Sequence, residues 1–135
     1  MMEVGMYSSD MDFYKKFYED LYAKRKNDIE IVRLLSRLYS ESGDLKKSVK
    51  MDRRYVKLDP TSPIAHYNLA CSLALIGKKT GAILEITRAI ELGYNDWQWL
   101  NDDTDLDSLR SCQKFKDMVS SKRMNKTKSC NKQIN

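Results

Sequence analysis

The feature that constrains this chain most is an internal repeat of 34 residues, which becomes visible when the sequence is compared with itself. Apolar, small and glycine positions then coincide in pairs: Leu35 with Leu69, Tyr39 with Leu73, Gly43 with Gly77, Ser48 with Ala82, Val49 with Ile83, Tyr55 with Ala89, Val56 with Ile90 and Leu58 with Leu92. A repeat of this length is typical of stacked helical units, each of which buries its apolar face only against its neighbours. We therefore expect a short array of such units, with Gly43 and Gly77 in turns that need a positive φ.

The spacing of apolar residues predicts that every element is a helix. Apolar positions recur close to every 3.6 residues, and no stretch alternates with the period of a strand. Helices are expected over residues 10–26, 28–42, 44–58, 62–76 and 78–92. Asp28, Asp44 and Ser62 are placed to N-cap three of them, and Pro63 falls at the favourable first helical position.

Length, composition and charge limit the kinds of protein to consider. A chain of 135 residues with 32% charged and 41% hydrophobic residues is long enough for one modest core. It has no transmembrane pattern, no visible signal peptide and three distant cysteines, so we expect a cytoplasmic protein. The net charge of +5 equals that of the five cations in residues 122–135, which we predict to be a disordered basic tail on a neutral body.

Two stretches, residues 29–62 and 63–96, resemble tetratricopeptide repeats. The motif positions are Leu35, Tyr39, Gly43-Asp44, Ser48, Tyr55 and Leu58-Asp59-Pro60 in the first copy, and Tyr67-Asn68-Leu69-Ala70, Gly77, Ala82, Ile86 and Ala89-Ile90-Glu91-Leu92 in the second. Residues 10–28 resemble the second helix of a further repeat, and Asp52 breaks the hydrophobic class at its aligned position. The resemblance implies an all-α fold, a short α-solenoid of antiparallel helix pairs.

The segment 97–121 resembles the block that closes many bacterial arrays of this family. It carries an aromatic stretch and an Asp-Leu-x-x-Leu-Arg sequence ending at Arg110. The resemblance implies a C-terminal helical cap, in which Trp97, Trp99, Leu100 and Leu106 cover the apolar face of the helix at 78–92. Residues 1–9 are expected to form a flexible N-terminus.

The residues with catalytic or metal-binding chemistry form no convincing constellation. His66 is the single histidine and lies beside apolar residues, which favours a packed structural role. The run Gly77-Lys78-Lys79-Thr80 lacks the spacing of a phosphate-binding loop. Asp103, Asp105 and Asp107 open a calcium-loop pattern that Ser108 and Lys114 do not complete, so we expect helix N-caps and first-turn charges at these positions. We therefore expect no enzyme activity, metal, cofactor or small-molecule substrate.

The family resemblance places the binding surface on the concave side, along the first helix of each repeat. The positions implied are Glu30, Arg33, Arg37, Ser40, Ile64, Tyr67, Cys71 and Ala74, and Asn68 matches an asparagine that some co-chaperones use on a peptide's C-terminal carboxylate. The candidate partner-binding residues are Arg33, Arg37, Ser40, Tyr67, Asn68 and Cys71. Arg33 and Arg37 could bind a carboxylate, or could form a solvated helix face with Glu30 and Glu41.

These observations favour a module that binds a protein or peptide partner in its groove. Two alternatives stay open. One is a dedicated secretion or assembly chaperone of the same fold. The other is a nucleic-acid-associated adaptor, in which the tail from Lys122 to Lys132 makes weak and unspecific contacts.

Overall fold

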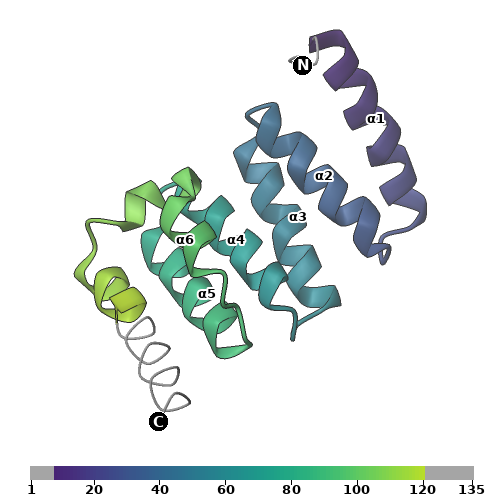
Figure 1. Cartoon of the computed structure of the whole chain (residues 1–135). Coiled ribbons are helices and arrows are strands. Elements are labelled where there is room, and N and C mark those ends of the chain that lie inside the picture. Colours follow the sequence, from purple (N-terminus) through teal and green to yellow (C-terminus); the bar gives the residue numbers. More distant parts are fainter. Residues whose placement is uncertain (1–7, 121–135) are drawn as a thin grey trace.

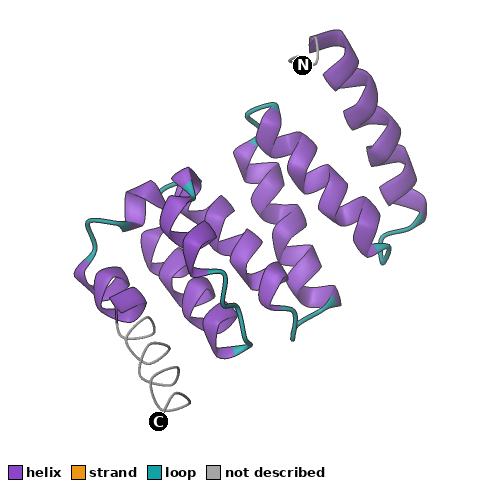
Figure 2. Ribbon diagram, in the orientation of Figure 1, coloured by secondary structure: helices purple, strands orange, loops and turns teal. Residues whose placement is uncertain are grey.

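The computed structural model describes residues 8–120, and the elements within this range are helices joined by short turns (Figures 1 and 2). They are α1 (Ser8–Lys24), α2 (Ile29–Glu41), α3 (Leu45–Leu58), α4 (Pro63–Leu75), α5 (Lys79–Glu91), α6 (Trp97–Asp102) and the 3-10 helix η1 (Thr104–Leu109), and residues 113–120 are also helical. The all-α prediction is confirmed, and the five predicted helices end within two residues of the observed bounds. The predictions for residues 1–7 and for the tail at 122–135 lie outside the described residues.

Consecutive helices pack against one another in chain order, so the structure is a row of helix pairs (Figure 1). The tight turns inside the pairs depend on glycine: φ is +85° at Gly43 and +81° at Gly77, as the repeat predicts. Gly93, which ends the second pair, also has a positive φ of +111°. Residues with a Cβ atom rarely adopt this conformation, so glycine at these positions lets each helix pair close.

Side-chain caps start two of the helices as expected. The Asp28 carboxylate accepts hydrogen bonds from the backbone N–H groups of Glu30 and Ile31 at 3.1 and 3.4 Å. Ser62 accepts from the N–H of Ala65 at 3.1 Å, with proline at the start of α4. These caps satisfy donors that have no partner within the helix.

Asp44 stands at the predicted N-cap of α3, but its side chain makes no capping hydrogen bond. Instead its carboxylate accepts from Lys15 Nζ on α1 at 3.0 Å. This hydrogen bond is the main cause that lowers the pKa of Asp44. Asp44 thus links α1 to the turn between α2 and α3.

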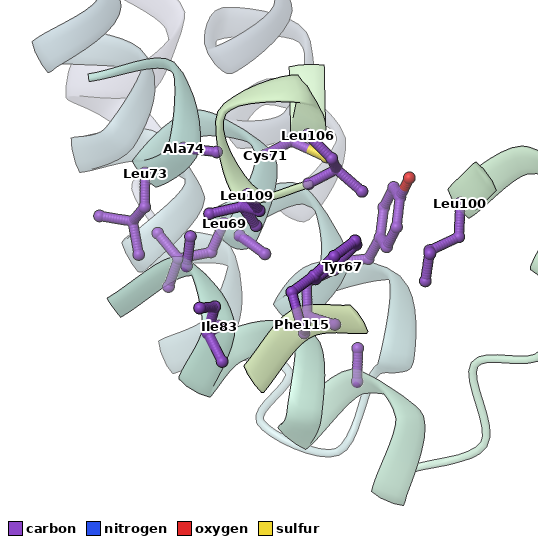
Figure 3. Packing of buried hydrophobic residues seen from close by; sticks show 14 of the residues in the cluster. Tyr67, Leu69, Cys71, Leu73, Ala74, Ile83, Leu100, Leu106, Leu109 and Phe115 are labelled. Carbon is purple, nitrogen blue, oxygen red and sulfur yellow. The ribbon is translucent and has the colours of Figure 1, made fainter. Parts of the chain in front are cut away.

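The buried apolar side chains form two clusters, one for each half of the array. The N-terminal cluster joins α2 and α3 and includes one residue of α4, with α1 packed on it: Ile31, Val32, Leu35, Tyr39, Met51, Tyr55 and Ala65. The C-terminal cluster is larger and joins α4, α5 and the segment after α5. Figure 3 shows Leu100, Leu106 and Leu109 in the same cluster as Leu69 and Leu73 of the second repeat.

The segment after α5 packs differently from the predicted cap. Leu100, Leu106 and Leu109 are fully buried, but η1 lies mainly against α4 rather than α5. Trp97 is half-buried on the C-terminal cluster, whereas Trp99 is 57% exposed, so the prediction that Trp99 covers the last repeat is wrong. The physical reason is that the chain turns back after Gly93 and places the aspartates of η1 beside α4.

Within residues 8–120, no helix has both the length and the apolar content needed to cross a membrane.

Candidate binding groove

The six predicted partner-binding residues line one cavity of about 700 Å³, which we call the groove. Three come from α2 and three from α4: Arg33, Arg37, Ser40, Tyr67, Asn68 and Cys71. Ile64 and Ala74, which the family resemblance also places on the concave surface, do not line the groove. The 34-residue spacing therefore brings side chains of two repeats to one hollow, although this arrangement does not test what they bind.

Both groove arginines form ion pairs on their own helix. Arg33 Nη1 lies 3.5 Å from a carboxylate oxygen of Glu30, and Arg37 Nε lies 3.2 Å from one of Glu41. Arg33 also places its guanidinium carbon 5.6 Å from the centre of the Tyr55 ring. These are the ion pairs of the solvated-face alternative, so the positive charge on this wall is compensated locally. Binding of a partner's carboxylate here stays a prediction.

The opposite wall is built by α4 and by the segment that folds back on it. The Tyr67 hydroxyl donates to Asp103 Oδ2 at 2.6 Å, and its ring stacks on Tyr94 with 4.3 Å between ring centres. Cys71 Sγ lies 3.6 Å from the same Asp103 oxygen. Burial, followed by the negative charges of Asp103 and Asp105, raises the pKa of the Cys71 thiol, which therefore stays protonated near neutral pH.

Cys71, Asp103 and Asp105 each place one potential ligand atom within 4.8 Å of the others. Metal ions bind cysteine as the thiolate, and the raised pKa of Cys71 opposes that form. Asp103 already uses Oδ1 to accept from the backbone N–H of Asp105 at 3.0 Å, which agrees with its predicted role as a cap. The donor set thus fits a hydrogen-bonded wall better than a metal centre.

A buried polar cluster forms the floor of the groove. Ser36 Oγ donates to Asp52 Oδ1 at 2.5 Å, and Ser48 Oγ donates to the Ser36 carbonyl at 3.1 Å. Asp52 is only 5% exposed. Burial raises its pKa to about 6, against the opposing effect of hydrogen bonds from Ser36 and Ser72. In the described chain, the ionised form of Asp52 is therefore stabilised only by hydrogen bonds from serine hydroxyl groups.

The sequence prediction missed several charged or aromatic groove residues, and four of them bear on the charge of the groove: Asp52, Trp99, Asp103 and Asp105. A signal existed for Asp52, because it breaks the hydrophobic class in the repeat alignment. No signal existed for the other three. They reach the groove only because the chain folds back over α4, outside the 34-residue repeat.

His66 lies away from the groove lining and is buried, as its structural interpretation predicts. One ring nitrogen lies 2.6 Å from a carboxylate oxygen of Glu85, and the other lies 2.8 Å from the Pro60 carbonyl oxygen. Both neighbours are oxygen atoms that can accept a hydrogen bond from the ring. His66 thus fastens α4 to α5 and to the turn before α4.

The solved structures include a chain with the same arrangement of helices, the crystal structure of MamA, a tetratricopeptide-repeat protein. The two chains superpose with a TM-score of 0.65 at 24% sequence identity, over 84% of this chain and 69% of that chain. The fold is tetratricopeptide-repeat-like. No protein-family profile and no curated protein matches the sequence.

Proposed function

We propose that this chain is a protein-interaction module that binds an extended segment or a helix of a partner protein in the groove between α2 and α4. The observation that carries the proposal is that side chains one repeat apart in the sequence line a single cavity. The fold supports it, because stacked helix pairs create extended concave surfaces suited to another chain.

Asn68 is the groove residue best suited to contact a partner's backbone. It is half-buried in the wall, and its side chain forms no hydrogen bond with another residue of the described range. A primary amide offers both donors and an acceptor, which match the C=O and N–H groups of a peptide bond. We therefore place a backbone contact of the partner at Asn68.

Arg33 and Arg37 supply a second contact, to a carboxylate of the partner. The two residues are one helical turn apart on α2 and line the same wall. Their ion pairs with Glu30 and Glu41 are exposed, and such pairs contribute only about 0–1 kcal/mol each. A partner's carboxylate can therefore replace either glutamate at little cost in free energy.

Selection of 12-residue peptides from a random displayed library tests whether the groove is the binding site. The Asn68→Trp variant fills the groove wall, and Leu84→Trp places the same side chain on α5, where Leu84 is 58% exposed outside the groove. We expect peptides selected on the wild type to bind Leu84→Trp with unchanged Kd and Asn68→Trp at least tenfold more weakly. Equal binding to both variants would place the site elsewhere and refute the proposal.

The arginine contact has its own matched pair of variants. Arg33→Ala/Arg37→Ala should weaken the selected peptides at least tenfold, because each charge-assisted contact contributes about 1.5–3 kcal/mol. Arg53→Ala/Lys57→Ala removes two cations of equal spacing from exposed positions of α3 outside the groove, and should change little. An unchanged Kd in the folded arginine variant would show that Arg33 and Arg37 do not contact the partner and are part of a solvated helix face.

No observation on residues 8–120 favours the secretion-chaperone or nucleic-acid alternatives over this proposal. The cations from Lys122 to Lys132, on which the nucleic-acid alternative depends, lie outside the described residues.

A further inference from the structure

The groove carries a surplus of negative charge that its own residues do not neutralise. Its lining holds the guanidinium groups of two arginines and five carboxylates, those of Glu30, Glu41, Asp52, Asp103 and Asp105. Both arginines are paired with the two glutamates on α2. Within residues 8–120, none of the three aspartates forms an ion pair. The hydrogen bonds that Asp52 and Asp103 accept come from uncharged donors, so no cation of the described residues is paired with these three carboxylates.

Asp52 gives this surplus its strongest physical basis. The side chain is 5% exposed, yet its only hydrogen-bond donors in the described chain are serine hydroxyls. Burying an ionised carboxylate costs free energy because the charge loses its hydration, and a nearby cation offsets that cost. Because Asp52 lines the groove rather than a closed core, a ligand can supply that group.

Residues 97–109, which fold back on α4, add two more carboxylates and an aromatic ring to the groove. These belong to Asp103, Asp105 and Trp99. Burial, followed by the neighbouring charges of Asp103 and Asp107, raises the pKa of Asp105. Trp99 lines the same groove and is 57% exposed. An exposed indole in a groove that is also lined by carboxylates suits a cation, since the ring face attracts positive charge.

We infer that the groove binds a segment that carries an arginine or lysine side chain, with the cation placed beside Trp99, Asp103 and Asp105 and attracted also by Asp52 on the floor. The inference rests on the proposed groove function and adds the charge of the partner. It is compatible with an acidic group of the same segment on the α2 wall, where the arginines lie.

The variant Asp52→Asn/Asp105→Asn removes two of the three charges and leaves Asp103, which accepts the Tyr67 hydroxyl, unchanged. Both substitutions keep the side-chain shape and remove a charge that burial disfavours, so the thermal midpoint should not fall. The matched control, Glu91→Gln/Asp102→Asn, removes two exposed charges that do not line the groove.

The displayed 12-residue library, sorted at 50 mM salt against wild-type protein, provides the probe. We expect the selected peptides to be enriched in arginine or lysine relative to the unsorted library. Their Kd, from fluorescence polarisation, should rise about tenfold or more in Asp52→Asn/Asp105→Asn and stay unchanged in the control. Replacing the enriched basic residue of the peptide by glutamine should raise the Kd for the wild-type protein by a similar factor. The same replacement should raise the Kd for the aspartate variant little further.

The two proposals fail in different ways. Groove-dependent peptides without basic enrichment, or equal Kd for the wild type and the aspartate variant, overturn the charge inference and leave the groove function standing. A library that yields no peptide sensitive to Asn68→Trp overturns both.

Discussion

The two repeats share one backbone plan but differ in what they bury. Ser36, Ser48 and Asp52 are buried in the first repeat, and the positions 34 residues later are Ala70, Ala82 and Ile86. The first repeat thus places a polar cluster where the second has a continuous apolar contact. The C-terminal half also gains three fully buried leucines from the segment after α5. The difference indicates that the second repeat contributes more to the free energy of unfolding. The first repeat contributes less, because it buries the polar side chains that form the floor of the groove.

The largest effect is expected from Ile86→Ala. Ile86 is a fully buried member of the C-terminal cluster, and the cavity left by such a truncation costs about 2–5 kcal/mol. Chemical denaturation should show this loss, while Leu84→Ala, at an exposed position of the same helix, should be nearly neutral. A loss under 1 kcal/mol at Ile86 would mean that the second repeat is not the stable half.

Asp52, which is aligned with Ile86 in the first repeat, should give the opposite result, because its substitution should raise the free energy of unfolding. Asp52 has a folded pKa of about 6, above its ordinary value of 3.8, so its protonated form favours the native state. Ionisation of Asp52 therefore lowers stability progressively between about pH 4 and pH 6, by about 2–3 kcal/mol in total. Asp52→Asn cannot ionise and should be more stable than the wild type by that amount at pH 8, with no difference at pH 4.

Denaturation of both proteins across this pH range checks the prediction, because other titrating groups contribute equally to each and cancel in the difference. A difference that does not change with pH would show that Asp52 does not titrate in this window.

The smallest effects on stability are expected from the two tryptophans after α5, one of which packs on the core and one of which lines the groove. Trp97 packs on the C-terminal cluster, so Trp97→Ala should lower the free energy of unfolding by about 1–2 kcal/mol. Trp99 is mostly exposed in the groove, and Trp99→Ala should change stability by less than about 0.5 kcal/mol. Trp99→Ala should instead weaken binding of basic peptides. Equal stability losses would return Trp99 to the cap that the sequence predicted.

The helices, the turns and the groove residues of α2 and α4 follow from local rules and from the repeat. Apolar spacing and caps such as Asp28 and Ser62 fix the helix bounds, and the repeat of 34 residues places Arg33 and Tyr67 in the same groove. The groove residues from the segment after α5 depend on a tertiary event, the packing of η1 on α4, which the repeat does not encode. Asp103 was therefore predicted only as a helix cap, although its second oxygen binds Tyr67.

The central claim is that a partner segment binds between α2 and α4, and amide chemical shifts test it most directly. A peptide selected from the displayed library is titrated into the nitrogen-15-labelled chain of 135 residues. The account predicts saturable shifts at groove residues such as Arg37, Asn68 and Asp105, and none at Arg53 and Lys57 on the exposed face of α3. Shifts concentrated on the exposed aromatic residues of α1, with the groove amides unmoved, would contradict it.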